Sequence, residues 1–136
     1  MLPDGVLHAL DVQQSMIDEL TRRAAVQGVT NIIVQAGDAQ HLPYVDYTFD
    51  AAYMVGVLGE IPDATIALRE LHRVLKHGGR LIISEIVIDP DFIALRSLRR
   101  KAADAGFVFE RSIGPLLAYS AAFSLEPTKQ SCHIVA

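Results

Sequence analysis

The chain has 136 residues, of which 51% are hydrophobic and 21% are charged, so it has the size of one domain and is too apolar for an intrinsically disordered chain. Its formal net charge of −4 and its pI of about 5.6 count against a nucleic-acid partner that is bound by neutralising phosphates. No apolar run approaches the roughly 20 residues of a membrane-spanning helix, so no membrane partner is expected.

Short apolar runs alternate with amphipathic stretches, which is the pattern of βα units and a parallel sheet. The first unit is predicted as a strand at Val6–Leu10, a helix that ends at Gly28, and a strand at Asn31–Gln35. Ser15 is expected to cap the helix, with Asp18 as its capping-box partner. A loop then leads to the second half of the chain.

The second half continues the alternation with a strand at Phe49–Val55, a helix capped by Asp63 and a strand at Leu81–Ile88. The apolar character of the last strand is typical of a parallel strand that is buried on both faces. Gly78-Gly79 is predicted to be a helix C-cap rather than a phosphate-binding loop, because a helix ends before it and none begins after it.

Asp89-Pro90-Asp91 is expected to open a third helix, which ends at Gly106. Strands at Phe107–Ile113 and Ala118–Leu125 follow, and their short connection forces an antiparallel pair. The fold class is therefore α/β: a doubly wound, mostly parallel sheet with a C-terminal antiparallel hairpin. We expect one domain at residues 1–127 and a flexible tail at 128–136. The single cysteine, Cys132, allows no internal disulfide, and a cytoplasmic location is expected.

Ligands of doubly wound sheets bind beyond the carboxyl ends of the strands, so the residues that leave each strand are candidate site residues. Asp11 follows the first strand, and its carboxylate suits a ribose diol or the cap of the next helix. Gly37-Asp38-Ala39 follows the second strand, where Asp38 can accept from an exocyclic amine or belong to a loop turn. The small residues from Gly56 to Gly59 after the third strand suit close contact with a ligand. None of the five histidines has a close metal-ligand spacing to another, so no metal site is expected.

Four motifs are informative in combination: Ala9-Leu10-Asp11-Val12, Gly37-Asp38-Ala39, Asp46-x-Thr48-Phe49-Asp50, and Leu68-Arg69-Glu70-Leu71-x-Arg73-Val74-Leu75-Lys76-x-Gly78-Gly79-Arg80-Leu81. Together they resemble the class I S-adenosylmethionine-dependent methyltransferases, in particular the small-molecule group of ubiquinone and menaquinone biosynthesis. The resemblance extends from about Gly5 to Pro127. It implies a Rossmann-like fold, S-adenosylmethionine as cofactor, and methyl transfer to a small-molecule substrate.

The resemblance also implies roles for single residues. The positions that match the family's cofactor contacts are Asp11 for the ribose, Val12, Asp38 and Ala39 for the adenine, and Val55 and Gly56 for the methionine moiety. Where the family usually has a Leu-His pair, this chain has Leu58-Gly59-Glu60, so a histidine-based proton role is not carried over. Glu60 is left as a candidate base, a substrate ligand, or a residue that only lines the cleft.

The family's opening strand, glycine-rich loop and first helix have no counterpart in this sequence. In the family's sheet that strand is central, so two neighbouring strands would keep unpaired edges that invite a second copy or a partner chain. Three hypotheses follow. The chain is a truncated methyltransferase that is weak or inactive alone, a non-catalytic remnant that acts by association, or a Rossmann oxidoreductase fragment in which Asp11 holds an NAD ribose. Asp38-Ala39 and the terminal hairpin count against the last of these.

Overall fold

A computed structural model describes residues 5–125, so Cys132 and the predicted tail at 128–136 lie outside the described residues. The chain divides into two compact units, Met1–Pro43 and Tyr44–Ala136. We refer to them as the first unit and the second unit, and each has its own sheet. The predicted single domain at residues 1–127 stays a prediction.

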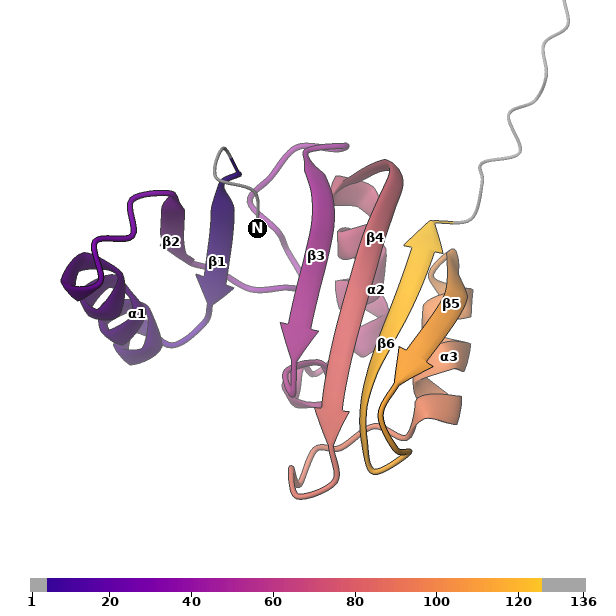
Figure 1. The fold of residues 1–136 in the computed structure, drawn as a ribbon. Helices are drawn as coiled ribbons and strands as arrows, with labels where there is room; N and C mark the ends of the chain where they lie inside the picture. The colour runs from indigo at the N-terminus through magenta and orange to yellow at the C-terminus, as the bar shows by residue number, and fades with distance from the viewer. Residues whose placement is uncertain (1–4, 126–136) are drawn as a thin grey trace, which may run out of the picture. The chain divides into compact units, whose positions relative to one another are not determined.

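The first unit is a parallel two-stranded sheet with one helix. Strand β1 (Leu7–Asp11) pairs with β2 (Ile32–Ala36), in a register that sets Leu7 opposite Ile32 and Asp11 opposite Ala36. Helix α1 (Gln14–Val26) connects the two strands, as expected for a βαβ unit (Figure 1). Both strands lie within one residue of their predicted bounds.

The predicted capping box of α1 is wrong. The helix begins at Gln14, so Ser15 lies inside it, and the N-cap residue Gln13 makes no side-chain capping bond. Asp18 instead accepts a hydrogen bond from Nε2 of Gln14 at 2.9 Å. The physical reason lies upstream, because the Asp11 carboxylate already accepts from the Gln13 amide at 2.8 Å and turns the chain into the helix.

The second unit is a four-stranded mixed sheet in the order β3-β4-β6-β5. Strands β3 (Phe49–Val55) and β4 (Leu75–Ile86) are parallel, whereas β6 (Ala118–Leu125) is antiparallel to both β4 and β5 (Phe107–Ile113). Three strands therefore run in one direction and β6 alone is reversed. This confirms the predicted fold class, including the hairpin at the end of the chain.

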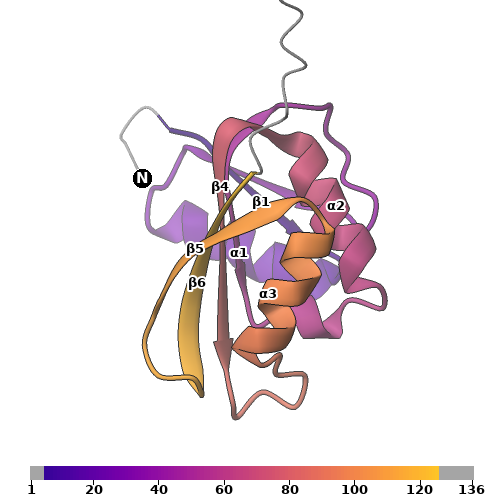
Figure 2. The same cartoon turned by 90° about the vertical axis from the view of Figure 1, so that its right-hand side faces the viewer.

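Helices α2 (Ala64–Val74) and α3 (Leu95–Asp104) cover one face of this four-stranded sheet, as Figure 1 and the perpendicular view of Figure 2 show. Asp63 caps α2 as predicted, because its carboxylate accepts from the Ile66 amide at 3.2 Å. The core between helices and sheet includes side chains with 0% exposure at Leu68, Leu81, Ile83, Leu98 and Phe123. None of the described helices is long and apolar enough to cross a bilayer.

The glycine pair after α2 forms a β-bulge, so its prediction as a helix C-cap is wrong. Helix α2 ends at Val74 and the chain becomes extended at Leu75, before the glycines. The pairing of β3 with β4 then jumps from Phe49–Leu75 to Ala51–Arg80, which leaves residues 76–79 bulged out. Gly78 has φ +75°, a conformation that favours glycine. Four residues of β4 lie between the partners of Phe49 and Ala51, which are separated by one residue on β3.

The third helix begins later than predicted. Helix α3 starts at Leu95, and residues 89–91 form a turn in which the Asp91 amide donates to Oδ1 of Asp89 at 2.9 Å. The Phe92 amide also donates to the Asp89 carbonyl, at 3.1 Å. The Asp89 side chain therefore closes its own turn instead of capping the helix, because its carboxylate is already engaged two residues downstream.

Each unit has an open sheet with two outer strands, and β1 and β3 are one outer strand of each. Among residues 5–125, β1 pairs with β2 alone and β3 pairs with β4 alone. These are the two strands for which the sequence predicted unpaired edges. An exposed strand edge presents unpaired amide and carbonyl groups, so each of these edges is a template for strand pairing.

Candidate functional site

The carboxyl ends of β1 and β2 bring Asp11 and Asp38 to the same edge of the first unit. The Gly37 amide donates to the Asp11 carbonyl at 3.0 Å. This main-chain hydrogen bond holds the residue before Asp38 next to Asp11. Asp11 Oδ1 accepts from the Gln13 amide, and Asp38 Oδ1 accepts from the Gln40 amide at 2.9 Å. Each carboxylate thus organises its own loop, which is the turn role considered for Asp38. For Asp11 the alternative was a helix cap, and the N-cap position of α1 is held by Gln13 instead. The role of the two carboxylates as cofactor ligands stays a prediction.

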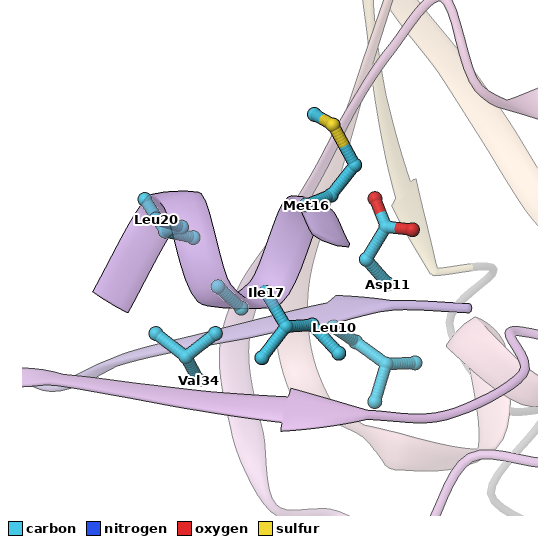
Figure 3. A pocket seen from close by; sticks show the side chains of 7 residues that line it. Leu10, Asp11, Met16, Ile17, Leu20 and Val34 are labelled. Atoms are coloured by element: carbon cyan, nitrogen blue, oxygen red, sulfur yellow. The ribbon is translucent and has the colours of Figure 1, made fainter. Parts of the chain in front are cut away.

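A small pocket of about 100 Å³ lies beside Asp11, between α1 and the two strands (Figure 3). It is lined by Ala9, Leu10, Asp11, Met16, Ile17, Leu20 and Val34. Figure 3 shows the Asp11 carboxylate on the Met16 side of this pocket, with Ile17, Leu20 and Val34 forming its apolar side. Because sites for drug-sized ligands have volumes of about 300–1,000 Å³, this pocket by itself is too small for a nucleoside.

The other predicted cofactor residues of the first unit are placed as follows. Val12 is 70% exposed, so an apolar surface for a flat ligand is open at the end of β1. Ala39 is half-buried beside the exposed Asp38. A Cβ at Gly37 would lie 2.5 Å from Cδ1 of Leu10, so a larger residue there would require the Leu10 side chain to move. Contact with Leu10 is thus one reason for a glycine here, and the close approach of a ligand to Gly37 stays a prediction.

In the second unit, the segment after β3 also packs closely, but against the chain itself. The Gly56 amide donates to the Ser84 carbonyl at 2.9 Å, and a Cβ at Gly56 would lie 3.0 Å from Oδ2 of Asp89. A Cβ at Gly59 would collide with the Asp91 carbonyl. The glycines therefore let the 89–91 turn approach the end of β3. Val55, which precedes them, is 55% exposed and free to contact a ligand.

Three acidic side chains converge where the parallel strands β3 and β4 end. Glu60, in the short 3-10 helix η1 (Leu58–Glu60), lies with Asp89 and Asp91 so that one oxygen of each falls within 4.8 Å of the others. Glu60 and Asp91 are exposed and Asp89 is half-buried. Sequence reasoning singled out Glu60 and missed the two aspartates, although both follow the carboxyl end of a predicted parallel strand.

Glu85 is a buried carboxylate near this cluster that the sequence did not single out as a site residue. Alternation along β4 places it on the same face as Leu81 and Ile83, and it is 4% exposed. Neither of its oxygens makes a well-formed hydrogen bond within residues 5–125. Burial raises its pKa above the usual range; the Ile93 amide opposes this increase and the charge of Asp89 adds to it.

The hydroxyl group of Tyr119 does not donate a hydrogen bond to Glu85. The Tyr119 hydroxyl donates to the Ile93 carbonyl at 2.5 Å, so its proton is already used. Burial raises the pKa of Tyr119, and the nearby Glu85 charge raises it further. The phenol therefore stays protonated, and Glu85 is left without this partner.

Residues 3–83, more than half of the chain, match the family described as "Methyltransferase domain". The chain is 38% identical over 84 residues to a demethylmenaquinone methyltransferase of Lactobacillus johnsonii, an alignment that covers 61% of this chain and 34% of that protein. It is 36% identical over 84 residues to a ubiquinone/menaquinone biosynthesis C-methyltransferase of Saccharophagus degradans, with the same coverage. The chain thus spans about a third of the length of these curated relatives.

Two solved structures share the fold. A SAM-dependent methyltransferase from Aquifex aeolicus superposes with a TM-score of 0.81 at 21% identity, covering 90% of this chain and 70% of that one. The [4+2]-cyclase SpnF superposes with a TM-score of 0.74 at 25% identity, covering 80% of this chain and 44% of that one. The matched fold is thus found in a methyltransferase and in a protein named as a cyclase, so the fold alone does not define the reaction.

Proposed function

This chain belongs to the class I S-adenosylmethionine-dependent methyltransferase family, and from that premise we propose that it binds S-adenosylmethionine for methyl transfer to a small molecule. The observation that carries the proposal is the pair of acidic residues at the carboxyl ends of β1 and β2, inside the matched region. The relatives named as demethylmenaquinone methyltransferases support an acceptor of the quinone class.

The residues of the first unit are suited to a nucleoside. We assign the ribose hydroxyls to Asp11, because one of its oxygens is used within its own loop and its other oxygen accepts no hydrogen bond within residues 5–125. Asp38 is exposed and can accept from the adenine amine, while Val12 and Ala39 offer apolar contact to the base. The pocket of about 100 Å³ is too small to enclose the ligand, so we place the nucleoside outside it, over the ends of the strands.

In the second unit, Val55 and Gly56 are proposed to lie beside the methionine moiety, and Glu60 to be a base or acceptor ligand. S-adenosylmethionine supplies a sulfonium methyl group that is already activated. The protein therefore has to position the two reactants in line and exclude water, and no nucleophilic side chain is required.

We also propose that this chain alone is a weak methyltransferase or an inactive one. The unpaired edges of β1 and β3 support this proposal, because strands with a free edge leave the backbone at the cofactor end less fixed. The same edges favour a second candidate function, in which the chain acts by association with a partner or a second copy that completes the sheet.

Isothermal titration of the purified chain with S-adenosylhomocysteine tests the proposal. We expect binding in the micromolar range, and Asp11→Ala should weaken it about tenfold or more, the loss typical of a hydrogen bond to a charged group. Asp18→Ala is the matched control, because Asp18 is an exposed aspartate of α1 that bonds only Gln14 among the described residues. No binding at millimolar ligand would overturn cofactor binding by this chain and favour the association role.

A further inference from the structure

Large aliphatic side chains are exposed together at one end of the second unit. They lie in residues 86–88, at the end of β4, and in residues 113–118, where β5 turns into β6 (Figure 1). We call these two stretches the apolar tip. The aliphatic side chains of the tip with exposed fractions between 46% and 81% are Ile86, Val87, Ile88, Ile113, Leu116 and Leu117. Contiguous exposed apolar surface of this kind marks contact with a partner or a membrane.

Main-chain hydrogen bonds hold the two stretches together as one surface. The Val87 amide donates to the Leu117 carbonyl at 2.8 Å. The Ala118 amide donates to the Pro115 carbonyl at 3.0 Å and closes the hairpin turn, and a Cβ at Gly114 would collide with the Ala118 carbonyl. The exposure of the tip is therefore set by the end of the sheet itself.

The tip lies at the end of the second unit where we place the methyl acceptor. Because β3 and β4 are parallel, their carboxyl ends lie at the same edge of the sheet, with Glu60 after β3 and the tip at the end of β4. The residue after Ile88 is Asp89, whose Oδ2 would lie 3.0 Å from a Cβ at Gly56. The tip thus borders the positions proposed for the methionine moiety and the acceptor.

The size, shape and charge of the tip favour a lipid surface as its partner. A stable protein interface takes about 20–30 residues a side, whereas the tip has three residues in one stretch and six in the other. A small-molecule site is concave, whereas Ile88 is 81% exposed and projects from the surface. The tip has no charged residue, so charge does not select its partner. A bilayer requires no matched shape, because each apolar side chain that enters it contributes on its own.

We propose that the apolar tip inserts into the surface of a lipid bilayer. The purpose of this contact rests on the proposed function: an apolar acceptor of the quinone class partitions into lipid, and the tip brings the acceptor end of the sheet to it. The expectation of no membrane partner rested on the length of a membrane-spanning helix, and insertion at the bilayer surface requires no such helix.

Flotation of the purified chain with phosphatidylcholine vesicles, without cofactor or quinone, tests the proposal. We expect reversible binding with a partition constant of about 10⁴ M⁻¹, the strength of a single acyl chain. Because the tip is uncharged, binding should be the same at about 0.5 M salt. Ile88→Ser and Leu116→Ser should each weaken it about tenfold, since each removes a large apolar side chain from the lipid.

Val45→Ser is the matched control, because Val45 is 77% exposed and precedes β3, at the opposite end of the sheet from the tip. It should bind vesicles like the unsubstituted chain, and circular dichroism should show all variants folded. An equal loss in Val45→Ser would overturn the proposal, as would no flotation at about 5 mM lipid.

Two further results would assign the tip to another partner and overturn the proposal. One is binding that requires anionic phosphatidylglycerol and is lost at high salt, because that is electrostatic attraction. The other is a dimer that Leu116→Ser abolishes, without vesicle binding, because the occupant is then a second copy. The vesicles contain no S-adenosylhomocysteine, so failure here is separate from failure of the cofactor titration.

Discussion

The two units carry the same parallel βαβ pattern, but they bury very different amounts of apolar surface. In the second unit, four strands and two helices enclose side chains with no exposure at all, such as Leu68 and Phe123. In the described part of the first unit, Ile17 is the one buried apolar residue, while Val12 and Val26 are at least 70% exposed. Two strands and one helix are too few to form a core of their own, so the pattern yields a stable unit only where further layers cover it.

The largest expected effect comes from opening the core of the second unit. Phe123 has 0% exposure and contacts Phe109 edge to face, with ring centroids 5.7 Å apart. Phe123→Ala should lower the free energy of unfolding by about 3–5 kcal/mol, the cost of a lost aromatic side chain and its cavity. Urea denaturation measures this value. Val26→Ala in the first unit should stay within about 0.5 kcal/mol, and equal losses at the two positions would contradict the comparison.

An intermediate effect, of opposite sign, is expected at Glu85. Replacing this buried carboxylate with methionine should raise the free energy of unfolding at pH 7 by about 1–3 kcal/mol, measured by urea denaturation. Burial raises the folded-state pKa above the usual value of 4.5, so the stability due to the protonated form is present below about pH 4.5. It is lost as the pH rises through the folded-state pKa.

Glu85→Met should therefore also remove this pH-dependent loss, while the unsubstituted chain keeps it. Urea denaturation at pH 4.5 and at pH 7 compares the two, with 4.5 taken from the ordinary pKa of the group. A variant that is less stable than the unsubstituted chain at both pH values would show that Glu85 has a stabilising partner in the folded state.

The smallest effect compares one substitution in both units. Ile83 has 0% exposure and Ile17 has 7%, yet Ile17 has no second layer around it. Removing a buried methyl group costs about 0.5–1.5 kcal/mol. Ile83→Val should fall at the upper end of that range and Ile17→Val at the lower end, as measured by urea denaturation. The reverse order would mean that the first unit is the better packed of the two.

Local sequence patterns predicted the elements well where an element depends on its own residues. The bounds of β3, β5 and β6 agree with the predictions, because turn residues and alternation mark both ends of each strand. The bulge at Gly78-Gly79 could not be predicted in this way. It is a property of the pairing between β4 and its neighbour β3, and neither strand reveals that pairing alone.

The candidate site shows the same division. Asp11 and Asp38 were found because each follows its own strand, and the structure places both at the carboxyl ends of β1 and β2. The acidic cluster was missed because it forms only when the ends of β3 and β4 are set side by side. Asp89 and Asp91 were interpreted as a helix start, a local role that their sequence fits equally well.

The bulge between Leu75 and Arg80 also determines where this chain tolerates a change of length. Beyond Arg80, side chains alternate strictly between the two faces of β4, so the deletion of one residue there would turn Leu81 and Ile83 toward the face without helices. Residues 76–79 do not follow the strand ladder, and a residue gained or lost there changes only the size of the bulge. The bulge thus protects the register of the strand that carries Leu81, Ile83 and Glu85 into the core.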